Sequence, residues 1–510
     1  MPEALPGKHE SYWMDTTEPT TWGSLAGEVR VDVAVVGGGI AGLTVASELK
    51  RRGRTVAVLE AGRVAASVTG HTTAKLTALH TLKYDHIGRH FGAEKARLYA
   101  DSQQAAIEYV AARVEAEGID CDFERTPAYT YTVDPAEVEQ VQAEVAAARL
   151  AGLQASYVTE SELPYGFAGA IRVDQQAQFH PRRFLLHVAA QIPGDGSHIY
   201  EQTRVTGVDE GSPCRVTTAG GTVVADHVVI ATHYPILDRA LLFSRLEPHR
   251  DVVVAAPIDA AAAPLGMYIS TESNTRSVRT APYDDGRRLL IITGEPFKPG
   301  HEDDVTGRYA ALTAWTREHF GDLDFTHRWS TQDNTSTDRV PYVGPLHVGA
   351  KNTWVATGFG GWGMSNGTMS GLLLADLMTG VANPWAPLYD PRRIKPLTEA
   401  KKFAKANLDV AKRFVGDRLH SDKVDTADDI APGQAVVVRV KGEQTACYRD
   451  EAGTLHAVSA VCTHLGCIVA FNDAELSWDC PCHGSRFDVD GAILQGPANK
   501  PLERRGPDAP

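Results

Sequence analysis

Long apolar runs, positive charge and cysteines outside one short stretch are scarce in this sequence. Nowhere in the 510 residues do about 18 apolar residues follow one another, so the sequence predicts no membrane span. Lys and Arg number 50 against 64 Asp and Glu, and the formal net charge of −14 argues against nucleic acid as a partner. The segment from Met1 to Thr17 lacks a cationic start followed by an apolar stretch, so we expect no export signal and a cytoplasmic location.

The 7 cysteines are unevenly distributed along the chain. Three are scattered, at Cys121, Cys214 and Cys447, whereas four lie close together near the C-terminus, at Cys462, Cys467, Cys480 and Cys482. In a chain expected in the cytoplasm, this clustering indicates a metal site before a disulfide framework. The length suggests two or three domains, and a content of 43% hydrophobic and 22% charged residues is ordinary for a folded protein.

A dinucleotide-binding pattern opens the larger part of the chain. An apolar strand at Val31–Val36 leads into the turn Gly37–Gly42, a helix running to about Arg52, and a second strand at Thr55–Glu60. Three glycines match G-x-G-x-x-G, with Ile40 and Ala41 between the last two: Gly37 allows a tight turn, Gly39 lets a pyrophosphate approach, and Gly42 lets helix and strand pack closely. Glu60 provides an acceptor for a ribose hydroxyl and argues against a 2′-phosphate.

The chain divides into four parts by composition and periodicity. Residues 1–30 are an N-terminal extension, and 31–380 are predicted to form an α/β or α+β body with helices near 85–118 and 136–151 and strands near 222–230 and 288–293. Residues 381–424 are a linker containing a basic helix at Thr398–Leu419, which either packs on the body or attaches to a membrane surface. Short alternating segments, 435–440 and 455–461, predict a small all-β domain over 425–510.

Two cysteine–histidine loops lie in that last part. The first is Cys462-x-His464, and the second is Cys480-x-x-His483. Two thiolates and two imidazoles are the ligand set of a Rieske 2Fe-2S cluster, and a Cys2His2 zinc site uses the same ligand types.

Residues 425–505 resemble the Rieske domains of cytochrome bc-type complexes. The resemblance implies that Cys462 and Cys480 hold one iron, that His464 and His483 hold the other, and that Cys467 and Cys482 form a disulfide between the loops. Gly496–Ala498 resembles the proline loop that covers the cluster. Ser485 is retained, but Phe487 stands where high-potential members have a tyrosine, so we expect an intermediate potential within the range of roughly −150 to +300 mV.

Residues of about 30 to 380 resemble the FAD-dependent oxidoreductases of the D-amino-acid oxidase type, which include sarcosine oxidase, glycine oxidase and dimethylglycine dehydrogenase. The segments that carry the resemblance are 66–75, 226–232, 339–344 and 357–364. The implied FAD contacts, beyond the glycine turn and Glu60, are Ser67, Thr69, His71, Thr232, Gly358, Gly360, Gly361, Trp362, Gly363 and Met364. Trp362 departs from the smaller or imidazole side chain of many relatives, which bears on the shape of the substrate pocket.

Several polar residues admit more than one interpretation. His71 either bonds covalently to the flavin, as a histidine does in dimethylglycine dehydrogenase, packs against it noncovalently, or is structural. His80, His86 and His90 are expected to be solvated or capping rather than metal-binding. Arg182 or Arg183, in a segment that resembles one near flavin and substrate, either clamps a substrate carboxylate or is a surface or helix-cap residue.

Together these patterns predict a two-cofactor redox enzyme that lacks a mononuclear iron site. By the resemblance, FAD oxidises a small amine, an amino acid or an N-methylated substrate. Because flavin takes two electrons and a Rieske cluster carries one, electrons are expected to pass from FAD to the cluster and on to an external one-electron carrier. Two alternatives stay open: a reductase fed through the cluster, and an electron carrier or redox sensor without its own substrate.

Overall fold

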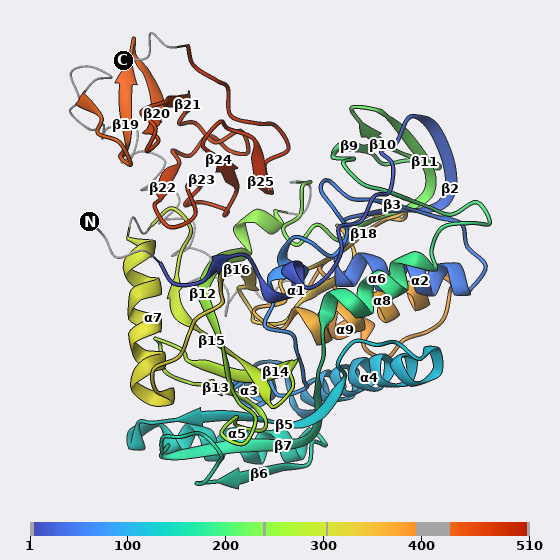
Figure 1. Cartoon of the computed structure of the whole chain (residues 1–510). Coiled ribbons are helices and arrows are strands. Elements are labelled where there is room, and N and C mark those ends of the chain that lie inside the picture. The colour runs from blue at the N-terminus through green and yellow to red at the C-terminus, as the bar shows by residue number, and fades with distance from the viewer. Residues whose placement is uncertain (1–4, 238–240, 302–303, 394–428, 507–510) are drawn as a thin grey trace.

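The computed structural model describes residues 5–237, 241–301, 304–393 and 429–506. Within these ranges a body built on two large sheets carries most of the helices, and two small sheets follow at the C-terminal end (Figure 1). This arrangement confirms the predicted fold class, a mixed α/β body with a small all-β domain. The predicted helix at 398–419 lies outside the described residues. No helix among the described residues is long and apolar enough to cross a membrane.

The first large sheet contains the predicted dinucleotide-binding unit. Its central strand β2 pairs in parallel with β3 on one side and β11 on the other. The described strands, in spatial order, are β17 (Tyr342–Pro345), β18 (Thr353–Thr357), β11 (Gly221–Ile230), β2 (Gly27–Val36), β3 (Val56–Leu59) and β8 (His198–Tyr200), with β10 (Cys214–Thr218) and β9 (Val205–Asp209) extending from β11. The helices against this unit include α2 (Ile40–Arg51), α6 (Pro181–Ala190) and α8 (Gly363–Met378).

Two glycines explain how the turn after β2 starts α2. Gly37 has a φ of +107°, and a Cβ on it would lie 2.4 Å from the carbonyl oxygen of Ala231. A Cβ on Gly42 would lie 1.9 Å from the carbonyl oxygen of Gly37. Both positions therefore exclude any side chain, and the helix begins directly beneath the end of the strand.

The second large sheet forms the opposite half of the body. Its described strands run in the order β1 (Lys8–His9), β16 (His327–Ser336), β12 (Leu246–Asp259), β15 (Arg287–Phe297), β14 (Ser277–Asp284), β13 (Met267–Ser270), β5 (Glu124–Thr132), β7 (Gly169–Gln178) and β4 (Lys75–Leu76), and β6 (Ala155–Val158) pairs with β7. The remaining helices are α1 (Tyr12–Asp15), α3 (Tyr84–Phe91), α4 (Ala93–Glu117), α5 (Val138–Leu150), α7 (Val305–Phe320) and α9 (Ala386–Tyr389). The N-terminal segment joins this half, because β1 pairs with β16 and Trp13 is fully buried.

The C-terminal domain consists of two small antiparallel sheets. One contains β19 (Ala435–Val440), β20 (Glu443–Arg449) and β21 (Leu455–Ser459), and the other β22 (Ala470–Asn472), β23 (Ser477–Asp479), β24 (Arg486–Asp488) and β25 (Ile493–Gln495). Trp478 and Phe487 are completely buried between them. Figure 1 shows the second of these sheets lying against the ends of β12 and β16.

Candidate functional site

A large cavity lies between the two large sheets and the C-terminal domain. Its volume is about 1060 Å³, and its lining begins at the glycine turn after β2 and extends past β12 and β16 to the C-terminal domain. Most of the residues expected to contact FAD line it: Gly37, Gly39, Ile40, Ala41, Glu60, Ser67, Thr69, His71, Thr232, Gly360, Gly361, Trp362, Gly363 and Met364. Gly42 and Gly358 do not line the cavity; Gly42 instead permits the close packing beneath the turn.

The nucleotide end of the cavity fits an extended dinucleotide such as FAD. The Glu60 carboxylate accepts hydrogen bonds from the backbone N–H groups of Gly38 at 2.7 Å and Gly62 at 2.8 Å. Burial raises the pKa of Glu60, and these two bonds oppose that effect. The cavity exceeds the usual pocket for a drug-sized ligand, and its wall at the turn consists of backbone without side chains. Glu60 thus lines the end of the cavity at the glycine turn, and its contact with a ribose hydroxyl stays a prediction.

The segment around His71 is fixed by two buried tryptophans. The Trp13 indole donates to the carbonyl oxygen of Thr72 at 2.6 Å, and the Trp329 indole donates to that of His71 at 2.9 Å. His71 Nδ1 lies 2.9 Å from the carbonyl oxygen of Ser67, and burial lowers the pKa of the ring. His71 thus presents a positioned imidazole to the cavity, which suits covalent or noncovalent contact with flavin.

The expectation for His80 was wrong. Its ring is fully buried, stacks on Trp362 with centroids 4.7 Å apart, and lies within 2.6 Å of the Tyr99 hydroxyl. Burial lowers its pKa well below the ordinary value. His86 and His90 stack on one another outside this cluster, with His90 exposed. His80 therefore supports the Trp362 side of the cavity.

The arginines proposed as a carboxylate clamp do not line the cavity. Arg182 is 1% exposed and donates to the Thr17 hydroxyl at 2.6 Å, so it is neither a clamp nor a surface residue. Arg183 pairs with Asp122 at 3.0 Å. Both arginines serve to anchor the N-terminal end of α6 to its surroundings.

Other polar residues that sequence reasoning did not assign line the middle of the cavity. They come from strands of the second sheet: Lys75, His249, Asp251, Ser277, Thr293 and Asp333. Lys75 is buried and hydrogen-bonds to Ser277, and burial, reinforced by Arg279, lowers its pKa to about 7. In the strand register, His249 on β12 lies opposite Asp333 on β16. Lys75 is the last residue of segment 66–75, which the sequence already assigned to the flavin site. The other residues lie on strands that are remote in sequence, and only the strand register shows that they meet Lys75.

The two cysteine–histidine loops lie side by side and have the same local hydrogen-bond pattern. Cys462 N–H donates to the Cys467 carbonyl at 2.8 Å, and Cys480 N–H donates to the Ser485 carbonyl at 2.8 Å. The rings of His464 and His483 are perpendicular, with centroids 4.9 Å apart. Cys462 and Cys480 are buried free thiols, and their mutual hydrogen bond lowers the pKa of Cys462 and raises that of Cys480. Two free thiols therefore lie in the loops that carry the two imidazoles, and this is the donor set of a Rieske cluster.

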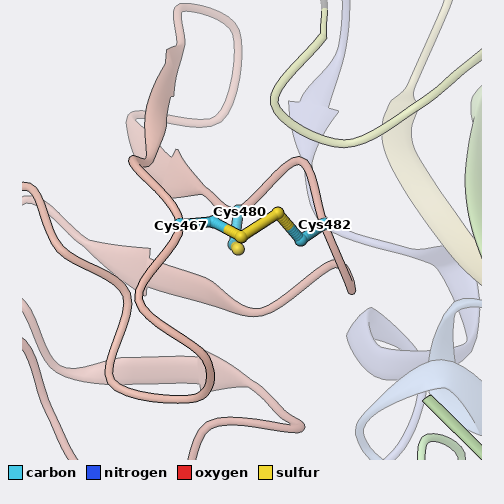
Figure 2. Close-up of side chains that lie close together, drawn as sticks. All are labelled: Cys467, Cys480 and Cys482. Carbon is cyan, nitrogen blue, oxygen red and sulfur yellow. A yellow bond between two sulfur atoms is a disulfide. The ribbon is translucent and has the colours of Figure 1, made fainter. Parts of the chain in front are cut away.

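The sulfur arrangement separates ligands from the structural bridge. Cys467 and Cys482 form the disulfide expected from the resemblance, and Cys480 lies beside it (Figure 2). Sulfurs bonded to one another are not thiolate ligands, so among these three cysteines the free thiol of Cys480 is the one that fits the predicted ligand role. Ser485 is fully buried, and its hydroxyl accepts the Ala498 N–H at 3.0 Å, which ties the second loop to the proline loop.

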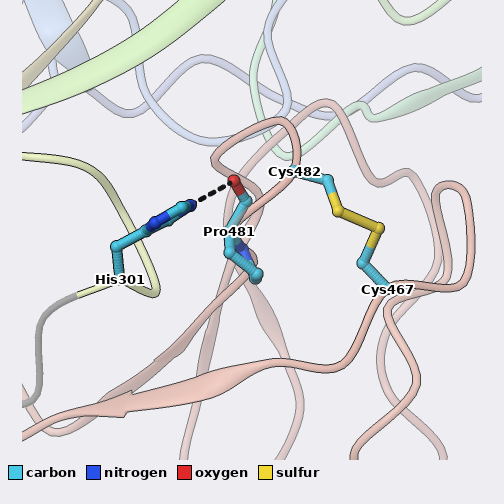
Figure 3. The surroundings of a disulfide bond; sticks show 4 residues. All are labelled: His301, Cys467, Pro481 and Cys482. Atoms are coloured by element: carbon cyan, nitrogen blue, oxygen red, sulfur yellow. Dashed lines mark hydrogen bonds between the residues drawn. A yellow bond between two sulfur atoms is a disulfide. The ribbon is translucent and has the colours of Figure 1, made fainter. Parts of the chain in front are cut away.

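The C-terminal domain is held to the body through a buried charge cluster. Glu475 pairs with Arg250 of β12 at 2.8 Å and with Arg486 of its own domain. The Asp473 carboxylate accepts the Val305 N–H at 2.8 Å, and His301 Nε2 donates to the Pro481 carbonyl at 3.3 Å, close to the disulfide (Figure 3). These contacts place the cysteine–histidine loops against the cavity-bearing body.

Fold and site together define an oxidoreductase whose dinucleotide cavity adjoins an iron–sulfur domain in the same chain. Two family models match: FAD dependent oxidoreductase over residues 32–377, and the Rieske [2Fe-2S] domain over residues 420–505. The chain belongs to the FAD-dependent oxidoreductase family and carries a C-terminal Rieske domain; it binds FAD and a 2Fe-2S cluster. The domain boundaries at 31, 381 and 425, and the individual cofactor contacts, remain predictions.

Known relatives match both the whole chain and its body. The putative Rieske 2Fe-2S iron-sulfur protein YhfW of Bacillus subtilis is 35% identical over 97% of both chains. Gamma-glutamylputrescine oxidoreductase of Escherichia coli is 24% identical, over 69% of this chain and 85% of that protein. The structure of glycine oxidase from Geobacillus kaustophilus matches with a TM-score of 0.58 and 21% identity, covering 72% of this chain and all of that one.

Proposed function

We propose that this enzyme oxidises a small amine, an amino acid or an N-methylated derivative and delivers the electrons through its Rieske domain to an external one-electron carrier. One observation carries the proposal: the same cavity is lined by the glycine turn, by polar residues of the second sheet, and by residues 493–496 of the C-terminal domain. The C-terminal domain therefore borders the same cavity that we propose holds the dinucleotide and the substrate. The substrates named for two relatives, gamma-glutamylputrescine and glycine, both carry amino groups.

The chemistry balances with the groups that the two domains bind. When bound, FAD would supply the two-electron acceptor for the hydride that a neutral amine carbon loses, and the cluster would supply one-electron transfer to the carrier. The product is an imine, which water hydrolyses. Lys75 Nζ is placed to accept the proton that a substrate ammonium must lose first, since burial lowers its pKa to about 7. Ser277 and Thr293 offer hydroxyl groups to orient the substrate.

Anaerobic reduction by a panel of amines, amino acids and N-methylated amino acids tests the proposal. The expected result is bleaching of the flavin absorbance, followed by appearance of the reduced Rieske electron paramagnetic resonance (EPR) signal. Cys462→Ser is the matched control: it removes a predicted cluster ligand, so the flavin should bleach without any Rieske signal. Reduction only by NAD(P)H or a reduced ferredoxin contradicts the proposed direction, and reduction by none of these donors favours the carrier alternative.

A further inference from the structure

The loop after β11 joins the cavity to the cluster ligands. Thr232 and His233 line the cavity. Tyr234, the next residue, is 2% exposed, and its ring centroid lies 5.9 Å from that of His483 and 6.4 Å from that of His464. The Tyr234 hydroxyl donates to the Phe243 carbonyl at 3.0 Å, and the Phe243 ring packs against His483 at 5.8 Å. Neighbouring residues of one loop thus contact the dinucleotide cavity and both imidazoles.

Strand β16 makes a second connection of the same kind. The Gln332 side-chain amide donates to the carbonyl oxygen of Gly484 at 3.1 Å, directly after His483. The following residue, Asp333, accepts the backbone N–H of Gly361 in the glycine loop that lines the cavity. Adjacent residues of this strand therefore bond to the second cysteine–histidine loop and to the glycine loop at Gly361, and both of these residues line the cavity.

Burial supports a fixed contact here. His483 is 3% exposed, and Gln332 is 2% exposed. A Cβ on Gly484 would lie 2.5 Å from Gln332 Nε2 and 3.0 Å from the Pro248 Cβ, so the second cysteine–histidine loop packs closely on β12 and β16. Interiors packed this closely keep their neighbours in place.

We propose that Tyr234 and Gln332 are positioning residues that hold His483 against the flavin cavity, so that electrons pass between flavin and cluster within one chain. The inference rests on the proposed function only in requiring that the two groups exchange electrons. Each passage oxidises the flavin by one electron and reduces the cluster by one. A flavin that carries two electrons needs two passages, with the external one-electron carrier reoxidising the cluster between them.

The test uses the full chain loaded with FAD and cluster, and needs no substrate. Under anaerobic conditions the flavin is reduced by light and deazaflavin, and cluster reduction is followed by its visible absorbance. In the wild type the rate is expected to be independent of protein concentration. In Tyr234→Leu and in Gln332→Leu the rate is expected to fall severalfold, because electron transfer slows as the separation between the two groups grows and these variants loosen the contact that holds His483 near the cavity.

Tyr234→Phe is the matched control, because it keeps the ring against the imidazoles and loses only the hydroxyl. Its rate should stay close to that of the wild type. The EPR spectrum of the reduced cluster, its midpoint potential and the FAD content are measured on each variant. A slower rate with these three unchanged identifies a positioning effect, which a loss of stability alone would not produce.

The outcomes separate the two proposals. If the photoreduced flavin of the wild type never reduces the cluster, the proposed function fails. If it does so at a rate proportional to protein concentration, electrons cross between chains and this inference fails alone. The inference is also overturned if both Tyr234→Leu and Gln332→Leu reduce the cluster at the wild-type rate. If Tyr234→Leu does not retain its cluster, the rate of Gln332→Leu alone tests the inference.

Discussion

Lys75 is a lysine enclosed in the cavity, and its protonation is coupled to folding. Burial lowers its folded pKa from 10.5 to about 7. The unfolded chain therefore binds more protons between these two values, so this residue makes the free energy of unfolding rise with pH. The slope is at most about 1.4 kcal/mol per pH unit. Lys75→Met should remove that dependence and should be more stable than the wild type near neutral pH.

The measurement is urea unfolding of both proteins at several values from about pH 7 to about pH 10, within the window that linkage defines. Lys351→Met, at an exposed lysine of the same body, is the control and should keep the wild-type slope. Equal slopes for Lys75→Met and the wild type would show that Lys75 is not held neutral in the cavity.

At the scale of elements, the sequence predicted best those that repeat one pattern over several residues. The unit from β2 to β3 was predicted closely, because an apolar strand, a glycine turn and a helix each leave a local pattern. The two cysteine–histidine loops could also be identified from the sequence alone. The residues of the cavity wall could not, because His249 and Asp333 meet only through the register of β12 with β16. His80 was misjudged because its partners, Tyr99 and Trp362, are remote in sequence.

The disulfide between the two cysteine–histidine loops gives a prediction at this scale. Cys467 and Cys482 are separated by 15 residues, and a loop of that length corresponds to about 3 kcal/mol of stabilisation in the chain-entropy view. The double variant with serine at both positions should lose about that much unfolding free energy in the Rieske domain. Urea unfolding followed by the visible circular dichroism of the cluster measures it.

Cys447→Ala is a suitable comparison, because Cys447 is a buried free thiol of the same domain. It controls for the loss of a buried sulfur without opening the bridge. If the double variant unfolds at the same urea concentration as Cys447→Ala, the bridge contributes nothing to domain stability, and its role is confined to the cluster itself.

For the whole molecule, strands β12 and β16 join the cavity to the C-terminal domain. The cross-strand pairs His249–Asp333 and Arg250–Gln332 both line the cavity, and Arg250 and Gln332 also bond to the Rieske domain. One pair of strands therefore forms part of the cavity wall and the docking surface of the cluster domain. This arrangement requires the two domains to keep a constant relative position.

Glu475 lies in the buried charge cluster that joins the two domains. Burial alone would raise its pKa, but Arg250, Arg486 and the Ser330 hydroxyl hold the pKa well below the ordinary value of 4.5. Because the folded pKa is depressed, the stabilisation is complete above the ordinary value and is lost as pH falls toward the folded one. Removing one partner of a buried pair typically costs about 3 to 5 kcal/mol, since the other charge stays buried.

Glu475→Gln should therefore lower the unfolding free energy of the docked Rieske domain by about 3 kcal/mol at neutral pH, and less as the pH falls below the ordinary carboxyl range. Urea unfolding monitored through the cluster, repeated at neutral and acidic pH, measures both effects. Glu503→Gln provides the control, because the Glu503 side chain is 74% exposed and pairs with Arg505 at the surface. If the two variants have the same stability at both pH values, the ion pairs of Glu475 with Arg250 and Arg486 do not stabilise the docked domain. The domains are then held together by their other contacts.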